Sequence, residues 1–392
     1  MDPAVPVKRG RVLPAGSFSD LQYSGFIEVS GDSVPAMLCA DVDLPNEVVI
    51  QWRSERTQIG FGVVCEVTWN GDKASLVPKI LHRVGSAGGL LSSIPLSPDE
   101  LVWMQESRAE LRAHGRGLEG EWVGPKGRHG RIDLSPLPTV SAAQVPKLGT
   151  WREFKDWADG VRADGVFSWF RGHSDSAMPL RTTLHRIGRC RLERYCFFEL
   201  KDFAGQAGAS FQKRFNLIDP EDYSLVLGLA RHHGLPTPLL DWTLSPYVSA
   251  FFAFSSALEN SELANTSGLV RIFALSHKLV VSLMPPMIVL PWVNPYVNAL
   301  AVGPLHNPRL TAQQGRFLVT NVVDVESHIR GIEGRVGEVC LTAVDIPRSV
   351  VREALQDLAF MGVTAATMFP GLDGIAKMFA HRMICGGASM DS

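Results

Sequence analysis

Short apolar runs separated by polar and turn residues occur in the first part of the chain, at residues 25–29, 47–52 and 61–69. Such runs, rich in Val, Ile and aromatic residues, are typical of strands. Asn70-Gly71 follows the third segment, and an Asn-Gly pair between apolar runs favours a hairpin because a type I′ turn needs positive φ at both central positions. We therefore expect a small β domain at the start of the chain.

A helix is expected to close this domain. The segment Ser97-Pro98-Asp99-Glu100 supplies an N-cap, a proline at the first helical position and the glutamate of a capping box. The positions that follow at helical spacing are Leu101, Met104, Arg108 and Leu111. Glycine and proline are frequent from residue 115 to residue 146, which predicts a last hairpin and a linker. We expect residues 1–140 to form a β-rich domain with one helix, followed by a linker at 141–150.

The second part of the chain alternates between helical and extended patterns, which we assign from the spacing of its apolar residues. The expected helices lie at residues 151–157, 191–203, 222–231, 247–254 and 348–360, and the expected strands at 166–171, 268–274 and 340–344. The proline-rich stretch 279–307 is expected to be a long loop, and loops of that length are usually functional or mobile. Residues 151–385 are therefore expected to form a mixed α/β domain.

The composition is that of an ordinary globular protein, with 392 residues, 45% hydrophobic residues and a formal net charge of −2. The length exceeds the size at which a single core usually stops growing, which favours two domains. The near-neutral charge argues against a general DNA-binding protein, because such proteins attract phosphates through a basic surface.

The cysteines and the apolar segments bear on location. The six cysteines are scattered without a CxxC pair, so we expect buried free thiols. No signal-peptide pattern opens the sequence, and the longest apolar stretch, residues 279–293, is interrupted by prolines and is shorter than the roughly 20 residues of a spanning helix. We expect a cytoplasmic protein without a membrane segment.

Four segments of the second part carry residues suited to chemistry: residues 169–173, 231–246, 309–317 and 368–374. They resemble the FRG-domain family, which is named for the Phe-Arg-Gly tripeptide found here at residues 170–172. The family pattern continues with Gln-His-Tyr-Gly-Leu-Pro-Thr-Arg-Leu-Leu-Asp-Trp-Thr, and residues 231–243 match most of it. The resemblance spans roughly residues 150–380 and implies an FRG domain over residues 151–385.

The chain departs from the family pattern at several positions. His173 stands where glutamine is common, Arg231 and His233 replace glutamine and tyrosine, Pro238 replaces an arginine, and Gly371 stands where an acidic residue is frequent. Roles that rest on those side chains are in doubt here. The matching positions are Arg171, His232, Pro236, Thr237, Asp241, Trp242, Thr243, Ser245, Pro246, Gln314, Gly315 and Asp373.

Arg171 and Gly172 end an apolar strand, and we interpret them as a cofactor-binding pair. The planar guanidinium of Arg171 suits a pyrophosphate because it donates two parallel hydrogen bonds, and Gly172 would let a ligand approach the backbone. The alternative is a buried ion pair between Arg171 and Asp241 that ties the strand to a loop.

His232 and the segment Asp241 to Ser245 are the central candidates. His232 ends a helix, where an imidazolium is favoured, and is either catalytic or hydrogen-bonded within the following turn. Asp241, Thr243 and Ser245 would share one face of an extended segment, with Trp242 on the other. Asp241 and Thr243 are catalytic candidates, and Ser245 is either a cofactor contact or the cap of the helix that starts at Pro246.

The later segments add three further candidates. Arg309 and Gln314 are predicted to contact a cofactor through a guanidinium and an amide. Asp373 lies in a Pro-Gly-Leu-Asp-Gly sequence, so it is either a catalytic carboxylate or a turn residue. The histidines lack the spacing of a metal motif, and no metal is expected.

An early strand-end arginine, a central Thr/Ser segment and a late carboxylate are broadly similar in order to ADP-ribosyltransferases. This arrangement favours an ADP-ribosyltransferase-like fold and NAD-dependent transfer to a protein or nucleic acid, with an effector role as a toxin or in phage defence. One alternative is a module that recognises a nucleotide or phosphate without turnover. Another is RNA processing, with His232 and His173 as acid and base.

Overall fold

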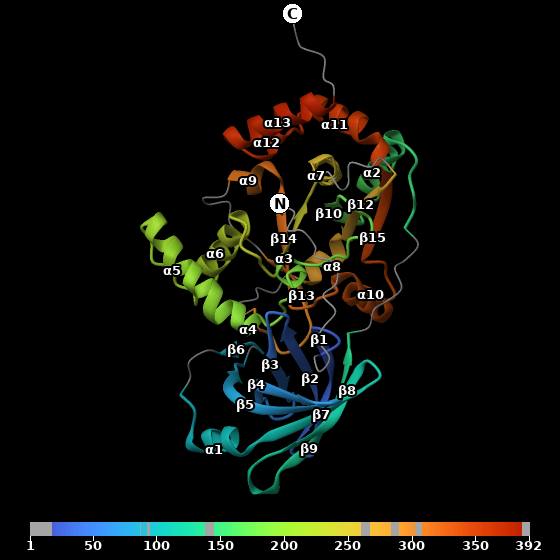
Figure 1. The fold of residues 1–392 in the computed structure, drawn as a ribbon. Helices are drawn as coiled ribbons and strands as arrows, with labels where there is room; N and C mark the ends of the chain where they lie inside the picture. The colour runs from blue at the N-terminus through green and yellow to red at the C-terminus, as the bar shows by residue number, and fades with distance from the viewer. Residues whose placement is uncertain are drawn as a thin grey trace, which may run out of the picture.

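The chain is described from a computed structural model. The structure describes residues 18–86, 88–91, 95–137, 145–259, 267–283, 290–300, 302 and 308–385. It has a mixed α+β architecture, with a β-barrel in the N-terminal part and a sheet with helices in the C-terminal part (Figure 1).

The N-terminal part is a closed antiparallel barrel of eight strands. Their order is β4-β3-β2-β1-β9-β8-β7-β5, and β5 pairs back with β4 to close the ring. A short strand, β6 (Leu90–Leu91), extends the sheet from β5. The barrel strands are β1 (Gln22–Val29), β2 (Asp32–Asp41), β3 (Leu44–Arg53), β4 (Gly60–Asn70), β5 (Lys73–Val84), β7 (Arg108–His114), β8 (Gly117–Val123) and β9 (His129–Pro136).

The strands expected at residues 25–29, 47–52 and 61–69 are confirmed as parts of β1, β3 and β4. Alternation along the strands builds the barrel core, also in β2, which was not predicted. In β2 the inward positions Val34, Ala36, Leu38 and Ala40 join one buried cluster. The hairpin predicted at Asn70-Gly71 is also confirmed. Its turn is centred one residue later than expected, because Asn70 pairs with Lys73 and leaves Gly71 and Asp72 at the tip.

The helix predicted after Ser97 forms with its capping box, as α1 (Pro98–Glu106). The prediction that it continues through Arg108 and Leu111 is wrong, because these residues belong to β7. Leu111 is fully buried in the barrel, so a period of two overrides the helical spacing. The predicted linker is partly outside the described residues, which exclude 138–144.

The C-terminal part is built on a six-stranded sheet of order β13-β14-β11-β10-β12-β15, in which all neighbours are antiparallel. The strands are β10 (Phe167–His173), β11 (Leu239–Thr243), β12 (Leu269–Ser276), β13 (Val297–Leu300), β14 (Gly315–Thr320) and β15 (Leu341–Pro347). The strands predicted near residues 166, 268 and 340 are confirmed.

Helices cover both faces of this sheet (Figure 1). On one face, α2 (Trp151–Asp164), α7 (Pro246–Glu259) and α11 (Val351–Phe360) share a core with β12 and β15. On the same face, α4 (Leu192–Arg194), α5 (Leu200–Phe211) and α6 (Pro220–His232) pack over β11, β13 and β14. The opposite face is covered by α8 (His277–Ser282) and α10 (Val325–Val336). The remaining helices are α3 (Thr183–Arg186), α9 (Pro308–Ala312), α12 (Ala365–Met368) and α13 (Leu372–Cys385).

The stretch 279–307 differs from the expected loop in its described residues, because it contains most of α8 and the whole of β13. The prolines made this stretch resemble a loop, and the short strand β13 was not predicted because its partner, β14, lies later in the sequence. All six cysteines are buried free thiols, as predicted. Within the described ranges, no helix is long and apolar enough to cross a membrane.

A buried ionic cluster joins the barrel to the C-terminal part. The Arg191 side chain is 4% exposed and donates to Glu193 Oε1 at 2.7 Å and to Glu47 Oε2 of the barrel at 3.1 Å. The Asp41 carboxylate of β2 accepts from the backbone amides of Cys190 and Arg191 at 2.8 and 3.1 Å. Beside these bonds, Met37, Cys39, Val49, Val64 and Cys190 form an apolar cluster between the two parts.

We predict that Arg191→Met destabilises the chain far more than Arg189→Met. Removing Arg191 leaves buried Glu193 without its partner, and breaking such a pair costs about 3–5 kcal/mol. Arg189 pairs with Asp43 and Glu199, whose side chains are 46% and 28% exposed. Both carboxylates keep Arg194 as a partner when Arg189 is removed, so we expect a cost of about 1 kcal/mol or less there. Urea unfolding of both variants checks this, and equal losses would contradict the assignment of Arg191 as the joint.

Candidate functional site

The six-stranded sheet opens between β10 and β11. The two strands pair in register only at Phe170 and Thr243, whereas β10 pairs with β12 over most of its length. Beyond that point a side chain replaces the ladder, because Arg171 Nη1 donates to the Asp241 carbonyl oxygen at 2.6 Å. A buried backbone carbonyl needs a donor, and Arg171 supplies it where the strands diverge. We call this region the seam.

Asp241 lies at the seam between two arginines. Arg231, in the last turn of α6, donates through Nε to both carboxylate oxygens at 3.0 Å and also through Nη2. Arg171 Nη1 lies 3.7 Å from Asp241 Oδ2. The side chains of Arg171 and Arg231 are 10% and 6% exposed, and that of Asp241 is 33% exposed. The predicted Arg171–Asp241 ion pair is therefore present, with Arg231 as a second and closer partner.

The charge of Asp241 is fixed by these contacts. Burial alone would raise the pKa of the Asp241 carboxyl, but the charge and hydrogen bonds of Arg231 and the charge of Arg171 outweigh it and hold the pKa well below its usual range. Asp241 is therefore an anion at physiological pH. A carboxylate held in this way positions the arginines and is a poor proton acceptor.

His173 lies behind the seam and is 3% exposed. Its Nε2 accepts from Arg171 Nε at 3.2 Å, so Nδ1 carries the hydrogen that faces the Met178 carbonyl oxygen at 3.3 Å. Burial first, and then the charge of Arg171, lower the pKa of His173 well below its usual value. The ring is neutral and enclosed, which disfavours its hypothesised role in RNA processing.

Thr243 and Ser245 are held by local structure. The buried Thr243 hydroxyl donates to the Gln313 carbonyl oxygen at 2.7 Å and accepts from the Ser245 amide at 3.2 Å. Ser245 Oγ accepts from the Val248 amide at 3.3 Å, which is the capping bond of a helix that begins at Pro246. The helix-cap alternative thus accounts for Ser245, and Thr243 ties β11 to the segment before β14.

The third and fourth segments meet beside Thr243. Gln313 Nε2 donates to the Met368 carbonyl oxygen at 3.0 Å. The Arg309 guanidinium lies over the Phe369 ring at 5.5 Å, and Lys377 Nζ lies over the same ring at 4.9 Å. All four segments singled out in the sequence are therefore linked by direct contacts in the structure.

Gln314 and Asp373 are exposed beside this junction. Gln314 has a φ of +50°, in the left-handed region that non-glycine residues seldom adopt, so the chain turns sharply before β14. Asp373 lies in the first turn of α13, where the helix dipole favours a negative charge. The interpretation of Asp373 as a turn residue is therefore wrong, because it belongs to the helix, and its catalytic role stays a prediction.

His232 ends α6 beside the seam and is half-buried, and its ring centroid lies 4.9 Å from that of the exposed His233. The following turn is fixed by Thr183, whose Oγ1 accepts from the Thr237 amide at 3.0 Å. Among the described residues, no group of three or more His, Cys, Asp or Glu side chains is arranged to hold a metal ion.

Gly172 faces helix α7 and not an open cleft. A Cβ at this position would overlap the Ser249 carbonyl oxygen and contact the Ala253 side chain. The glycine of the Phe-Arg-Gly tripeptide therefore lets α7 pack directly on β10. This packing explains the residue without a bound cofactor.

Three residues of the site were not predicted from the sequence: Arg231, Thr183 and Gln313. Arg231 departs from the family pattern, but it is a lone cation at the end of the apolar run 225–230. A cation at that position signals a buried carboxylate partner, here Asp241 ten positions later. Thr183 and Gln313 act mainly through backbone contacts, for which the sequence gives no signal.

We predict that Gly172→Ala lowers the free energy of unfolding by at least about 2 kcal/mol, because the methyl group forces α7 away from β10. Gly160→Ala in α2 is the matched control. Its Cβ would meet nothing within 4 Å, so alanine should stabilise that helix by about 0.5–1 kcal/mol. Thermal unfolding without any ligand checks both, and an unchanged melting temperature for Gly172→Ala would favour a ligand-contact role.

We predict that Asp241→Asn destabilises the chain at pH 7 by about 2 kcal/mol, less than for a fully buried pair because the carboxylate is partly exposed. The folded-state pKa of Asp241 is lowered, so its contribution is complete above about pH 4 and is lost as the pH falls further. The gap between wild type and variant should therefore narrow below pH 4. Asp159→Asn, at an exposed position of α2, should change stability by less than about 0.5 kcal/mol at any pH.

A comparison with protein families finds a match that covers the seam. No curated protein matches the chain. The model of the FRG domain matches residues 167–262, a span that runs from β10 through Arg171, Arg231 and Asp241 to the end of α7. The matched span thus contains both strands of the seam and the helix that packs on Gly172. On this basis the chain contains an FRG domain, matched over residues 167–262.

Proposed function

We propose that the C-terminal part is an ADP-ribosyltransferase-like enzyme that uses NAD. The observation that supports this most is the convergence of all four sequence segments on the seam, where Arg171, Arg231 and Asp241 form a rigid base. Next to that base, Arg309 and Lys377 lie over the Phe369 ring. Cations beside an aromatic ring suit a ligand that combines phosphates with flat heterocycles.

Arg309 is the residue we assign to the pyrophosphate. It is half-buried, and among the described residues it has no carboxylate partner, so its guanidinium can bind phosphate oxygens. Arg171 is committed to the Asp241 backbone and carboxylate, and we assign it a positioning role. This differs from the expectation that Arg171 itself holds the pyrophosphate.

The reaction would proceed by displacement at C1′ of the nicotinamide ribose. The bond between C1′ and the nicotinamide nitrogen breaks, its electron pair leaves with nicotinamide, and a nucleophile of the acceptor bonds to C1′ and releases its proton. A carboxylate stabilises the positive charge that develops on the ribose. Asp373 is our candidate, because it is exposed and belongs to no ion pair within the described ranges.

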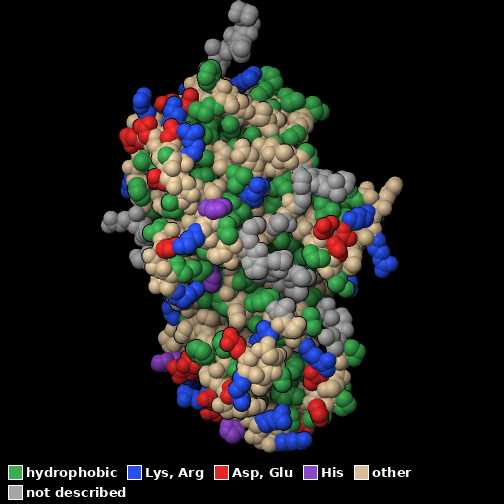
Figure 2. Space-filling view, turned by 180° about the vertical axis from the view of Figure 1, so that it is seen from behind, with side chains coloured by type: hydrophobic (Ala, Val, Ile, Leu, Met, Phe, Trp, Pro, Cys, Tyr) green, Lys and Arg blue, Asp and Glu red, His purple; other side chains and the backbone are tan. Residues whose placement is uncertain are grey.

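His232 and Gln314 complete the proposal as contacts to the nicotinamide ribose and its amide, from the edges of the same region. The acceptor would be a protein or a nucleic acid. On the face seen in Figure 2, basic and acidic side chains are interspersed, which disfavours long-range capture of a nucleic acid by charge alone. Our biological hypothesis is that this transfer gives the protein an effector role, as a toxin or in phage defence.

One observation favours a second candidate, recognition of a nucleotide or phosphate without turnover. Asp241 is ion-paired, Thr243 uses its hydroxyl in two hydrogen bonds, and His173 is enclosed. Three of the residues that could react are thus engaged within the protein. Binding of NAD without cleavage would be the signature of this candidate.

We predict that wild-type protein binds NAD and releases nicotinamide, measured by titration calorimetry and by mass analysis of the recovered nucleotide. Arg309→Ala should weaken binding at least about tenfold, because a charge-assisted hydrogen bond contributes about 1.5–3 kcal/mol. Asp373→Asn should keep binding but slow nicotinamide release about a hundredfold.

Arg352→Ala, exposed on α11, and Asp159→Asn are the matched controls and should behave as wild type. Binding with intact NAD in the wild type would replace the transferase with the recognition module. If the wild type shows no heat of binding at two temperatures and releases no nicotinamide, the transferase fails, and recognition is left with nucleotides or phosphates other than NAD.

A further inference from the structure

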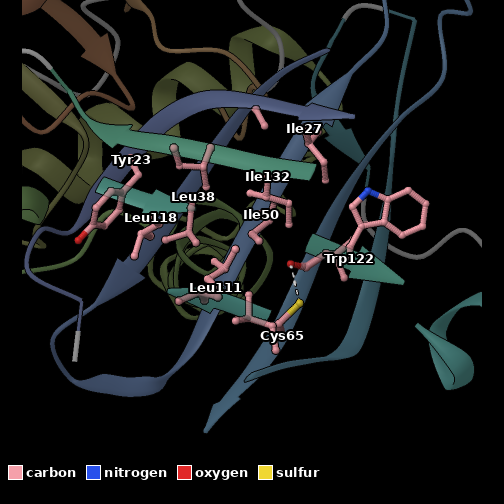
Figure 3. Close-up of a cluster of buried hydrophobic side chains, with 14 of the residues drawn as sticks. Tyr23, Ile27, Leu38, Ile50, Cys65, Leu111, Leu118, Trp122 and Ile132 are labelled. Carbon is pink, nitrogen blue, oxygen red and sulfur yellow. Dashed lines mark hydrogen bonds between the residues drawn. The ribbon is translucent and has the colours of Figure 1, made fainter. Parts of the chain in front are cut away.

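Side chains fill the interior of the barrel at one end but leave a cavity at the other. Tyr23, Leu38 and Leu134 are fully buried near the end of the barrel that contacts the C-terminal part. The opposite end contains a cavity of about 360 Å³, which we call the barrel cavity. Figure 3 shows Ile50, Cys65 and Ile132, all of which line the cavity, pointing from different strands into the barrel.

The wall of the barrel cavity is apolar and aromatic. Besides those three residues it includes the side chains of Ile27, Trp52, Phe61, Val63, Leu76, Leu81, Trp103 and Trp122. Eight-stranded barrels are just wide enough to be filled by side chains or to hold one small ligand. A volume of about 360 Å³ is at the lower end of the range for ligand pockets, so the space suits a small molecule with an apolar body.

A serine with a buried hydroxyl borders this apolar space. Ser107 joins α1 to β7, lines the barrel cavity and is 3% exposed. Its Oγ is buried, and within the described part of the chain it has no hydrogen-bond partner. Leaving a buried hydroxyl unpaired is unfavourable, and a polar atom of a bound molecule would satisfy it.

The mouth of the barrel cavity carries a cation. Arg128, between β8 and β9, lines both the barrel cavity and a second pocket that shares Ser30 and Trp122 with it and also includes His129. Arg128 is exposed, and no described acidic side chain forms an ion pair with it. The acidic residues of the lining are Asp32, Asp99 and Glu100. Asp32 and Glu100 pair with Arg56 and Arg83, and Asp99 lies in the first turn of α1. Arg108 is a second cation of the lining.

We infer that the barrel cavity binds a small amphipathic acid, with its apolar body among the tryptophans and its anionic group on Arg128. The apolar lining would contact the apolar body of the ligand, and the Ser107 hydroxyl would form a polar contact inside the cavity. The Arg128 guanidinium at the mouth would favour a ligand with a negative charge. The site is independent of the seam, since it opens at the far end of the barrel. It gives the N-terminal part a ligand-sensing role of its own.

Two fluorescent probes that differ only in one sulfonate group test this inference on the full chain. Anilinonaphthalene sulfonate carries an aromatic body with an anionic group, and phenylnaphthylamine is the same body without it. We expect one saturable site for the sulfonate on wild type, with phenylnaphthylamine binding about tenfold more weakly. Decanoate, an aliphatic acid, should displace the sulfonate probe.

Arg128→Ala should lower the affinity for the sulfonate about tenfold and leave that for phenylnaphthylamine unchanged. The control is Arg131→Ala, also on an exposed side chain but outside the lining, which should bind both probes as wild type does. Ala109→Phe places a ring in the cavity and should abolish binding of both, provided that circular dichroism shows a folded chain.

Two results would overturn the inference. The first is the absence of saturable binding to wild type. The second is unchanged sulfonate affinity in both Arg128→Ala and folded Ala109→Phe, which would assign the probe to another surface. Ser107→Ala adds an independent readout, because removing an unpaired buried hydroxyl should raise the melting temperature of the unliganded chain while weakening decanoate displacement.

Discussion

The organisation of the C-terminal part depends on Asp241 remaining charged between Arg171 and Arg231. These residues come from β11, β10 and α6, so their contacts tie two strands and a helix together. A buried carboxylate without partners would take up a proton, and buried arginines without a carboxylate would be strongly destabilising. The triad therefore sets the distance between the two halves of the sheet and holds the end of α6 against it.

Ion pairs with little exposure also join the barrel to the C-terminal part. Arg191, Glu193 and Asp41 are buried beside the half-buried Glu47, and their directional bonds fix one relative placement of the two parts. An apolar cluster next to them supplies area but little direction. The polar contacts thus define the geometry, while the apolar contacts supply most of the affinity between the parts.

Much of this fold follows from local sequence patterns, and the exceptions have physical causes. The capping box at Ser97, the Asn70-Gly71 hairpin and the strands on both sides of the tripeptide are signals that a few neighbouring residues carry. The strand β13 and the end of α1 were mispredicted because each depends on a partner strand distant in the sequence. The tripeptide pointed to the region of the site. The pair between Arg171 and Asp241 was among the alternatives, but Arg231, the closer partner of Asp241, was missed because pairing within a fold leaves no periodic pattern in the chain.

The single backbone pairing between β10 and β11 has a consequence for how such domains diverge. Each strand takes its register from its outer neighbour, β10 from β12 and β11 from β14. An insertion in the turn at residues 233–238, or in the segment 174–182, therefore shifts no hydrogen-bond ladder across the sheet. Relatives can lengthen these two connections and reshape the rim of the site while the strands stay in place. New specificities are in this way accessible by loop exchange without redesign of the core.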